Sequence, residues 1–380
     1  MPSLPPEIWL SICSYLHSHD LKSVSRSTKY LYGTAMPYLF RAINISRETA
    51  IAIEGGGYSD LTDYVRSATI RGFSDALLDA AITDLEASCR ALQYLPNVQH
   101  LKISFVAMRE AQAYIYLATF REISQYTCYQ KLTSLTLEFV PGTQSFSFNG
   151  NAIRSLSARI QKIMGDTSIS CPPNIERLDV SGMANSYFDF TVRAMPYPCV
   201  LFYPTANTLK KIRIETNSLI SPVADLDPIR NMNLATYSLV TEVWYIQNTH
   251  VNEFYSTYAE ICRRFPNTQN LRFDYDGVAL QRGSTAGETY QYLADLKKLR
   301  RAILPWPRHG YQSPIEPSSL GTSLGLWLRE LNFQSLEYVD FVTRSCYLSV
   351  GKVCRIKPAV PQPIGMIQQR SLRLSGEIGL

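Results

Sequence analysis

The stretch GTSLG at 321–325 matches the G-x-S-x-G pattern of a hydrolase nucleophile elbow. That motif presents its serine on a sharp turn after a buried strand, and it needs a histidine base later in the chain. The residues before Ser323 read SPIEPSSL, which is typical of a loop, and the last histidine, His309, precedes the serine. A hydrolase using Ser323 is therefore a weak alternative, and we favour a chain without catalytic residues.

Three further stretches have residue types that bind metal ions or phosphate, and each lacks part of the required spacing. His17 and His19 lie close together, but no third or fourth ligand is near them in the sequence. The glycines at 55–57 lack the G-x-G-x-x-G spacing and a Walker lysine. The stretch 274–277 begins like a calcium loop, but its glycine comes too early. The sequence therefore predicts neither a metal nor a cofactor.

Composition excludes other classes of protein. The eight cysteines are scattered without a Cys-x-x-Cys pair, which favours reduced, buried thiols in the cytoplasm or nucleus. The formal net charge of +5 is mild for 380 residues and does not by itself indicate nucleic-acid binding. No apolar run approaches the roughly 20 residues of a membrane helix, and the N-terminus lacks a signal-peptide pattern. We expect no nucleic-acid or membrane partner.

A strand pattern, apolar-x-x-apolar-x-apolar, recurs through most of the chain at intervals of about 30 to 40 residues. A degenerate copy is expected near 299–304. The pattern predicts a solenoid of strand-plus-helix units, with parallel strands on one face and helices on the other. The middle apolar positions are Ala68, Leu101, Leu135, Leu178, Ile212, Val243, Leu271 and Val339.

The segments between these strands show helical spacing of apolar residues. The predicted helices are 75–95, 108–126, 152–164, 251–265 and 290–303. Three helix-to-strand joints contain Pro-Asn, at 96–97, 173–174 and 266–267, because proline ends a helix and asparagine tolerates the turn. Loops are predicted at 141–150, 185–205, 277–287 and 305–323.

The residue between the last two apolar positions of each strand should point away from the core. This row contains one Trp and two Arg, which are residue types enriched in binding hot spots. We interpret the row as a surface for a protein target, with a merely solvated row as the alternative. Its members are Lys102, Thr136, Asp179, Arg213, Trp244, Arg272 and Asp340.

The segment 4–45 is predicted to form three short helices. Pro5 and Pro6 suit the first turn of a helix, Ser18 should cap the second and Pro37 should end the third. About forty residues cannot bury many apolar side chains alone. The alternatives are an exposed apolar patch for a protein partner and a cap that the following domain covers. The apolar stripe of the first helix contains Ile8, Ile12, Tyr15 and Leu16.

The sequences LPPEI at 4–8, DL at 20–21 and PYLFR at 37–41 resemble an F-box, particularly the fungal variety. The resemblance implies a three-helix module that binds the Skp1-like adaptor of an SCF ubiquitin ligase, and through it a cullin. The chain departs from the family at Trp9 and Cys13. The implied adaptor contacts are Leu4, Pro5, Ile8, Ile12, Leu16, Leu21 and Val24.

The repeats resemble the irregular leucine-rich-repeat domains that follow fungal F-boxes. The L-x-x-L-x-L core matches, whereas the period exceeds roughly 20–29 residues and the asparagine after the strand is mostly missing. A compact α/β domain is the alternative, which the even spacing disfavours. The predicted division is an F-box-like module at 1–46, a solenoid at 47–356 and a C-terminal tail at 357–380 that is expected to be disordered.

Together these features favour the substrate-recognition subunit of an SCF-type ubiquitin ligase, in the cytoplasm or nucleus. Such a subunit is not an enzyme, because it acts by holding a protein target beside a ubiquitin-loaded enzyme. The alternative is an adaptor-independent interaction scaffold of the same fold. That alternative gains weight if the first module packs onto the repeats and hides its apolar face.

Overall fold

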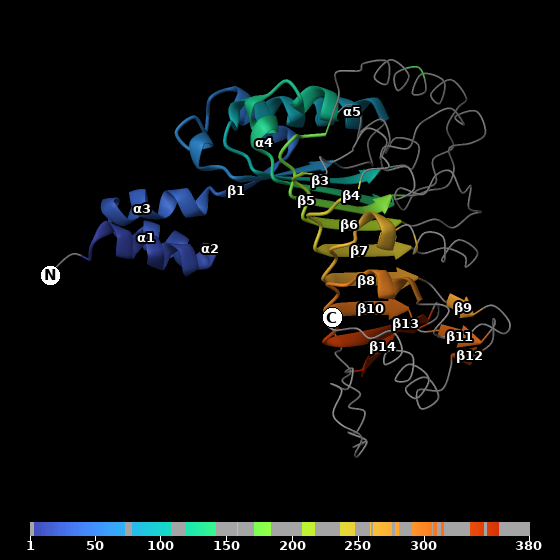
Figure 1. The fold of residues 1–380 in the computed structure, drawn as a ribbon. Coiled ribbons are helices and arrows are strands. Elements are labelled where there is room, and N and C mark those ends of the chain that lie inside the picture. Colours follow the sequence, from blue (N-terminus) through green and yellow to red (C-terminus); the bar gives the residue numbers. More distant parts are fainter. Residues whose placement is uncertain are drawn as a thin grey trace. The chain divides into compact units, whose positions relative to one another are not determined.

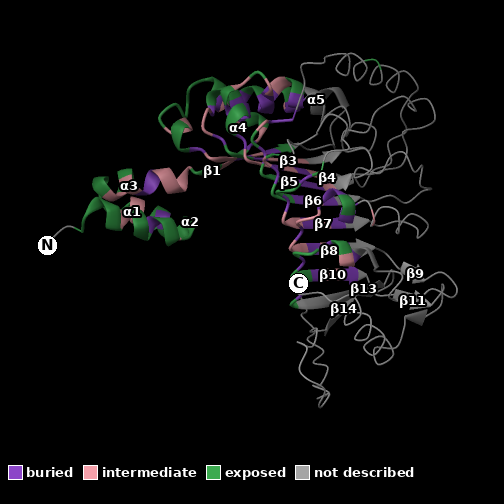
Figure 2. Ribbon diagram, viewed as in Figure 1, coloured by how far each residue is buried: buried purple, intermediate pink, exposed green. Residues whose placement is uncertain are grey.

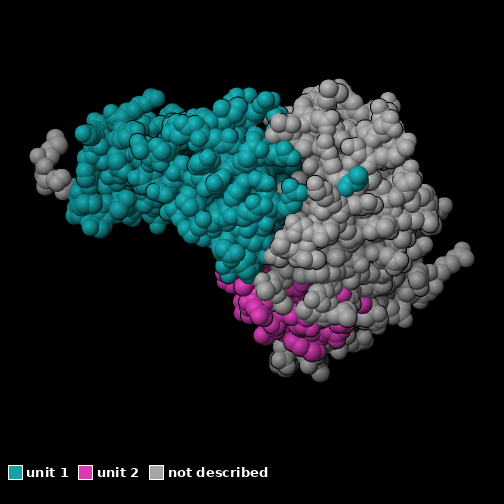
Figure 3. Space-filling view, turned by 90° about the horizontal axis from the view of Figure 1, so that it is seen from above, with its two compact units in different colours: residues 1–175 teal, residues 176–380 magenta. Residues whose placement is uncertain are grey.

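A computed structural model gives the fold in two compact units, Met1–Ile175 and Glu176–Leu380 (Figure 3). The predicted division at residue 46 stays a prediction, and the helical segment before it lies within the first unit. The structure describes residues 4–72, 78–107, 119–141, 158, 171–183, 207–216, 236–247, 259, 261–275, 278–280, 291–305, 307–309, 313–314, 335–345 and 348–356.

Three helices open the first unit: α1 (Pro6–Tyr15), α2 (Ser18–Ser25) and α3 (Lys29–Leu39) (Figure 1). Pro6 is the first residue of α1, as predicted, because a proline there loses no hydrogen bond. Ser18 begins α2 one residue after the cap position, which His17 occupies. Pro37 does not end α3, contrary to the prediction, because a proline in the last turn removes a single backbone hydrogen bond.

A small apolar core holds these helices together. Cys13 of α1, Leu21 of α2 and Ala35 of α3 are at most 4% exposed. Thr28 begins α3 by accepting a 3.1 Å hydrogen bond from the backbone N–H of Leu31. We call α1–α3 the helical module. Partly buried side chains pack against its core, namely Leu16, Val24, Tyr38 and Leu39.

The rest of the first unit alternates helices with parallel strands, each of which pairs with the next in the chain. The register places Ala68 beside Leu101 and Leu101 beside Leu135, so the middle repeat positions lie in one row. The strands are β1 (Ala42–Ile45), β2 (Ser67–Gly72), β3 (His100–Ala107) and β4 (Ser134–Pro141). The helices are α4 (Arg47–Glu54), η1 (Thr62–Tyr64), α5 (Leu78–Ala91), η2 (Leu92–Tyr94) and η3 (Thr127–Lys131).

Helices cover one face of these strands (Figure 1). α4 contacts β1 and α5 contacts β2. Ile70, Ile103 and Leu137 point to this covered side and are almost completely buried. Burial of each such side chain contributes about 1.5–3 kcal/mol to folding. The core of the first unit is therefore largely aliphatic, and the opposite face of the strands carries the outward residues.

The second unit repeats this arrangement with β5 (Arg177–Met183), β6 (Lys211–Thr216), β7 (Glu242–Gln247), β8 (Asn270–Tyr275), β10 (Arg301–Pro305) and β13 (Tyr338–Ser345). These strands are parallel and pair in chain order. A chain-ordered parallel sheet in each unit confirms the predicted α/β repeat. The leucine-rich-repeat identity stays a prediction.

Four strands of the second unit were not predicted. β14 (Leu348–Ile356) returns antiparallel to β13. A small separate sheet contains β9 (Val278–Leu280), β11 (Pro307–His309) and β12 (Ser313–Pro314). The last three strands lie in the stretches 277–287 and 305–323, which were predicted as loops. Strands of two or three residues are too short to show an alternating pattern.

Two aromatic pairs lie in the otherwise largely aliphatic core of the second unit. Tyr245 and Phe273 occupy paired positions on β7 and β8 and stack with ring centroids 5.5 Å apart. Tyr237 and Phe265 form a tilted pair at 5.6 Å. All four side chains are at most 1% exposed. Such pairs add about 0.5–1.5 kcal/mol to the stabilisation from burial alone.

The predicted helix over 290–303 is wrong. A short 3-10 helix, η7 (Gln291–Asp295), is followed by a turn and by β10. Leu296, Leu299 and Ala302 are buried at a spacing of three, which resembles helical spacing. This region is the degenerate repeat expected near 299–304. The basic residues at 297, 298, 300 and 301 therefore lie on a turn and at the start of β10.

The Pro-Asn joints form hydrogen bonds that the sequence did not predict. Each asparagine amide donates to a backbone carbonyl of the preceding repeat, so the joint connects consecutive repeats as well as turning the chain. A hydrogen bond of this kind contributes about 1 kcal/mol. The bonds run from Asn97 to Asp63 at 3.2 Å, from Asn174 to Gln130 at 2.7 Å and from Asn267 to Ser238 at 2.8 Å.

Some predictions fall outside the described residues. They are the serine motif at 321–325, the helix at 152–164 apart from residue 158, most of the helices at 108–126 and 251–265, the loops at 142–150 and 185–205, and the tail at 357–380. Where the predicted helix at 75–95 is described, α5 and η2 confirm it.

Candidate functional site

The first part of the predicted outward row lies on β2, β3 and β4. Lys102 pairs with Thr136 on β4 and with Thr69 on β2, and both predicted residues are half-buried. Thr69 was missed because the row was read only from β3 onward. Two residues further along the same face, Ser104 pairs with Glu138. The period-2 rule for strands would have identified this second row.

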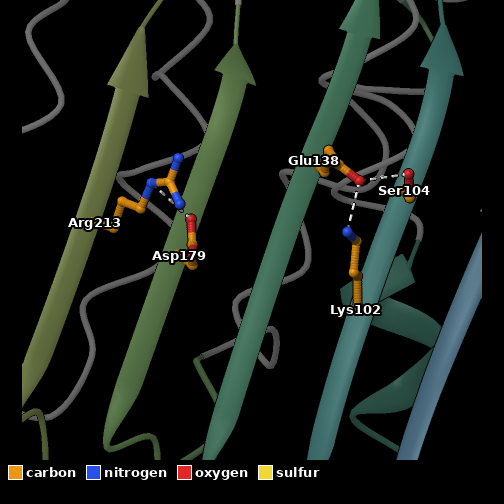
Figure 4. Close-up of polar contacts among 5 residues, drawn as sticks. All are labelled: Lys102, Ser104, Glu138, Asp179 and Arg213. Carbon is orange, nitrogen blue, oxygen red and sulfur yellow. Dashed lines mark hydrogen bonds and ion pairs between the residues drawn. The ribbon is translucent and has the colours of Figure 1, made fainter. Parts of the chain in front are cut away.

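Glu138 is the centre of a polar cluster on this face (Figure 4). Its Oε2 atom lies 2.8 Å from Lys102 Nζ and accepts a 2.8 Å hydrogen bond from Ser104 Oγ. The hydrogen bond from Lys102, followed by that from Ser104, holds the pKa of the Glu138 carboxyl below its ordinary value. Lys102 and Ser104 therefore supply hydrogen bonds to the Glu138 carboxylate from within the cluster. The side chains of the cluster are short or flexible.

The second unit carries the larger part of the predicted row. Asp179, Arg213, Trp244 and Arg272 occupy paired positions on β5 to β8, as predicted. Ile303 on β10 continues the row and pairs with Asp340 on β13. Ile303 was missed because the wrong helix prediction covered it. For Asp340 only the backbone position is described.

Trp244 lies between two arginines in this row. The guanidinium carbons of Arg213 and Arg272 are each 5.5 Å from the centroid of the Trp244 ring. A guanidinium at this distance from an indole face makes a cation–π interaction, which contributes about 0.5–1 kcal/mol at exposed sites. The parallel register creates the arrangement, because it aligns the same position of the repeat pattern across β6, β7 and β8.

Asp179 is nearly buried at 6% exposure, although the sequence placed it in an outward row. Its carboxylate lies 3.7 Å from Arg213 Nε (Figure 4) and 3.7 Å from Arg177 Nη2. Both arginine side chains therefore form ion pairs with this carboxylate. Asp179 therefore acts as an internal counter-charge that positions Arg213 beside Trp244.

Another outward row lies two residues before the Asp179 row on the same strands, and Lys211 and Glu242 form a 2.8 Å ion pair within it. We define the basic strand face as these two rows over β5–β8 and β10. Over β5–β8 and β10 the two rows contain five cations and two carboxylates, and Asp340 on β13 extends the second row by a third carboxylate. The first row is Arg177, Lys211, Glu242, Asn270 and Arg301. The second row is Asp179, Arg213, Trp244, Arg272 and Ile303.

The helical module presents a second candidate surface. Leu4, Ile8 and Ile12 follow one another at helical spacing and are 45%, 47% and 37% exposed. Pro5 is also exposed, and much of the surface of α1 is coloured as exposed in Figure 2. We call Leu4, Ile8, Ile12 and Tyr15 the α1 stripe. A row of exposed apolar side chains on a helix usually marks a surface to which a partner binds.

Three of the expected adaptor contacts lie elsewhere. Leu21 is 4% exposed and belongs to the core of the helical module, so its side chain is not part of the surface. Leu16 and Val24 are half-buried against the same core. The sequence could not separate these positions, because in a three-helix module the inner and outer apolar residues follow the same spacing.

The described thiols are inert structural groups. Burial raises the pKa of Cys89 to about 12, that of Cys128 to about 11 and that of Cys171 to about 12. A thiol with such a pKa is not a nucleophile at neutral pH. In the described residues no three His, Cys, Asp or Glu side chains gather as a metal site would require. His19 instead lies 3.5 Å from Asp20 at the surface.

No protein-family model matches this chain, and no curated protein is significantly similar to it. The site is therefore defined by its own geometry. Within the described part of the chain, every helix is too short or too polar to cross a membrane.

Proposed function

We propose that this protein is the substrate-recognition subunit of an SCF-type ubiquitin ligase. In this proposal the helical module binds a Skp1-like adaptor, and through it a cullin, while the repeat strands bind a protein target. The chain itself performs no chemistry, because proximity to the ubiquitin-loaded enzyme supplies the rate. The predicted identities of the two parts, F-box and leucine-rich repeat, belong to the same proposal.

The observation that carries this proposal is the exposed α1 stripe. An isolated module of three short helices gains little from leaving Leu4, Ile8 and Ile12 in water, because burying each of them would contribute about 1.5–3 kcal/mol. The core formed by Cys13, Leu21 and Ala35 stays closed without them. The stripe is therefore available to a partner without unfolding the module.

The experiment is a capture assay with purified Skp1 and the full chain. The variant Ile8→Ala/Ile12→Ala should lose at least tenfold in affinity, because central apolar contacts dominate interface energies. Ile51→Ala is the matched control, since Ile51 lies on α4 and is 58% exposed. It should bind like the unchanged chain.

Circular dichroism would establish that all three proteins are folded. Absence of binding by the folded, unchanged chain would remove the ligase proposal and leave an adaptor-independent scaffold of the same fold. Equal losses in the α1 variant and the Ile51 variant would show that the α1 stripe is not the contact.

A further inference from the structure

The outer side of α3 contains a glycine that the helix itself does not require. Gly33 lies inside the helix and is exposed, and a Cβ atom added to it would meet nothing within 4 Å. Its φ angle is not in the left-handed region that favours glycine. Glycine in a helix interior lowers stability relative to alanine. Gly33 therefore weakens α3 without a steric reason in the described part of the chain.

A proline on the same side removes the N–H that would normally pair with the Gly33 carbonyl. In an α-helix a carbonyl accepts from the N–H four positions later, and here that residue is Pro37, which has no N–H. Tyr30, Gly33 and Pro37 follow at spacings of three and four, so they share one side of α3, opposite the core residue Ala35. Because Gly33 has no side chain, a hydrogen-bond donor can approach its carbonyl from outside.

Tyr30 adds a large contact group to this side of the helix and is 49% exposed. Tyrosine is enriched at protein interfaces, because its ring supplies contact area and its hydroxyl group can still form a hydrogen bond. We call Tyr30, Gly33 and Pro37 the α3 face. It combines a large side chain, a place where another backbone can approach closely and a hydrogen-bond acceptor, which together suit a protein partner.

The limited area of the α1 stripe indicates which partner covers the α3 face. A stable interface buries roughly 800 Å² on each partner. The stripe has only four side chains, and those of Leu4, Ile8 and Ile12 are less than half exposed, so it cannot supply this area alone. The exposed residues of α2 are all polar, whereas α3 contacts α1 and carries the large exposed side chains of Tyr30 and Tyr32. A partner that covers α1 is therefore expected to extend over α3.

We propose that the partner of the α1 stripe also binds the α3 face, packing on Tyr30 and donating a hydrogen bond to the Gly33 carbonyl. The missing side chain at Gly33 lets the partner come close enough to form that bond. Water binds the carbonyl until the partner displaces it. This inference rests on the proposed function, because it extends the contact of the same adaptor from α1 to α3.

The test measures the affinity of the full chain for purified Skp1 by isothermal titration calorimetry, together with thermal unfolding by circular dichroism. Gly33→Gln fits the open space beside the helix and should unfold at the same temperature or higher. It should nevertheless bind Skp1 at least tenfold more weakly, because its side chain occupies the place of the partner. Pro37→Ala returns an N–H to the Gly33 carbonyl, so it should stabilise the chain and weaken binding several-fold.

A pair of tyrosine variants locates the contact. Tyr30→Ala should weaken Skp1 binding at least tenfold, because buried tyrosines are among the strongest contributors to interfaces. Tyr58→Ala is the matched control, since Tyr58 is 43% exposed and lies between α4 and η1, outside the helical module. It should change the affinity less than twofold.

Three outcomes would overturn the inference. Unchanged Skp1 affinity of Gly33→Gln and Tyr30→Ala, while Ile8→Ala/Ile12→Ala still loses binding, would leave the ligase proposal intact and remove only the α3 contact. A lower unfolding temperature of Gly33→Gln would show that the glycine serves the fold instead of a partner. Absence of Skp1 binding by the folded, unchanged chain would remove both proposals, so the two failures are distinguishable.

Discussion

On the outward face of the first unit, β3 and β4 carry small or flexible side chains, of which Lys102 and Ser104 make short polar contacts with Glu138. Thr136 belongs to the same face. The corresponding positions on β6, β7 and β8 in the second unit are Arg213, Trp244 and Arg272. Both sets stand on parallel strands paired in the same way. The backbone repeat therefore determines where an outward side chain stands, and the individual residue determines whether the position can bind a ligand.

The inner faces of the two units also differ in the residue types at equivalent positions. Ile103 and Leu137 pair on the inner side of the first unit, whereas Tyr245 and Phe273 stack at the equivalent place in the second. The second unit thus has large flat side chains on both sides of β7 and β8. Those on the inner side are buried and stabilise the fold, whereas those on the outer side are partly exposed. Three predictions test this distinction.

The largest effect is expected for the inner aromatic pair. Phe273→Ala should lower the free energy of unfolding by about 3–5 kcal/mol, because it leaves a cavity beneath Tyr245. Trp244→Ala, on the outer side of the adjacent strand, should cost about 1 kcal/mol, because it removes mainly exposed cation–π contacts. Urea denaturation of both variants measures the difference. Similar losses would show that Trp244 is a packing residue and would weaken its assignment to binding.

An intermediate effect is expected for the two outward carboxylates. Asp179→Ala should cost about 2–3 kcal/mol, because it removes a nearly buried charge between two arginines. Glu138→Ala should cost at most about 1 kcal/mol, because the side chains of Lys102 and Glu138 are 42% and 37% exposed and water screens the ion pair. Denaturant midpoints at neutral pH provide the comparison. A larger loss of stability for Glu138→Ala than for Asp179→Ala would contradict the prediction that the more buried carboxylate contributes more.

The smallest effect is a dependence of stability on pH in the first unit. The folded pKa of Glu138 lies below its ordinary value of 4.5. Its ionised form therefore contributes stability above about pH 4.5, and this contribution disappears as the pH falls through the folded pKa. The stability difference between the unchanged chain and Glu138→Gln should be small at pH 7 and should vanish in acid. A difference that grows in acid would contradict this assignment.

Much of the repeat could be predicted from the sequence. The apolar positions identified the strands because a buried strand face needs apolar side chains at fixed places. The middle positions from Ala68 to Leu271 are all buried. The same alternation correctly placed Arg213, Trp244 and Arg272 in one outward row. The error at 290–303 arose because Leu299 and Ala302, which belong to the repeat pattern, also continue the helical spacing of Leu296.

The tertiary structure decided what the row can do. The sequence lists Asp179 and Arg213 as equivalent outward residues, but only the register of β5 and β6 brings them into an ion pair and buries the carboxylate. The placement of Trp244 between two guanidiniums also depends on pairing across three strands. In the helical module, packing separates the buried Leu21 from the exposed Ile8 and Ile12. Local spacing cannot make these distinctions, because burial and pairing depend on residues far apart in the chain.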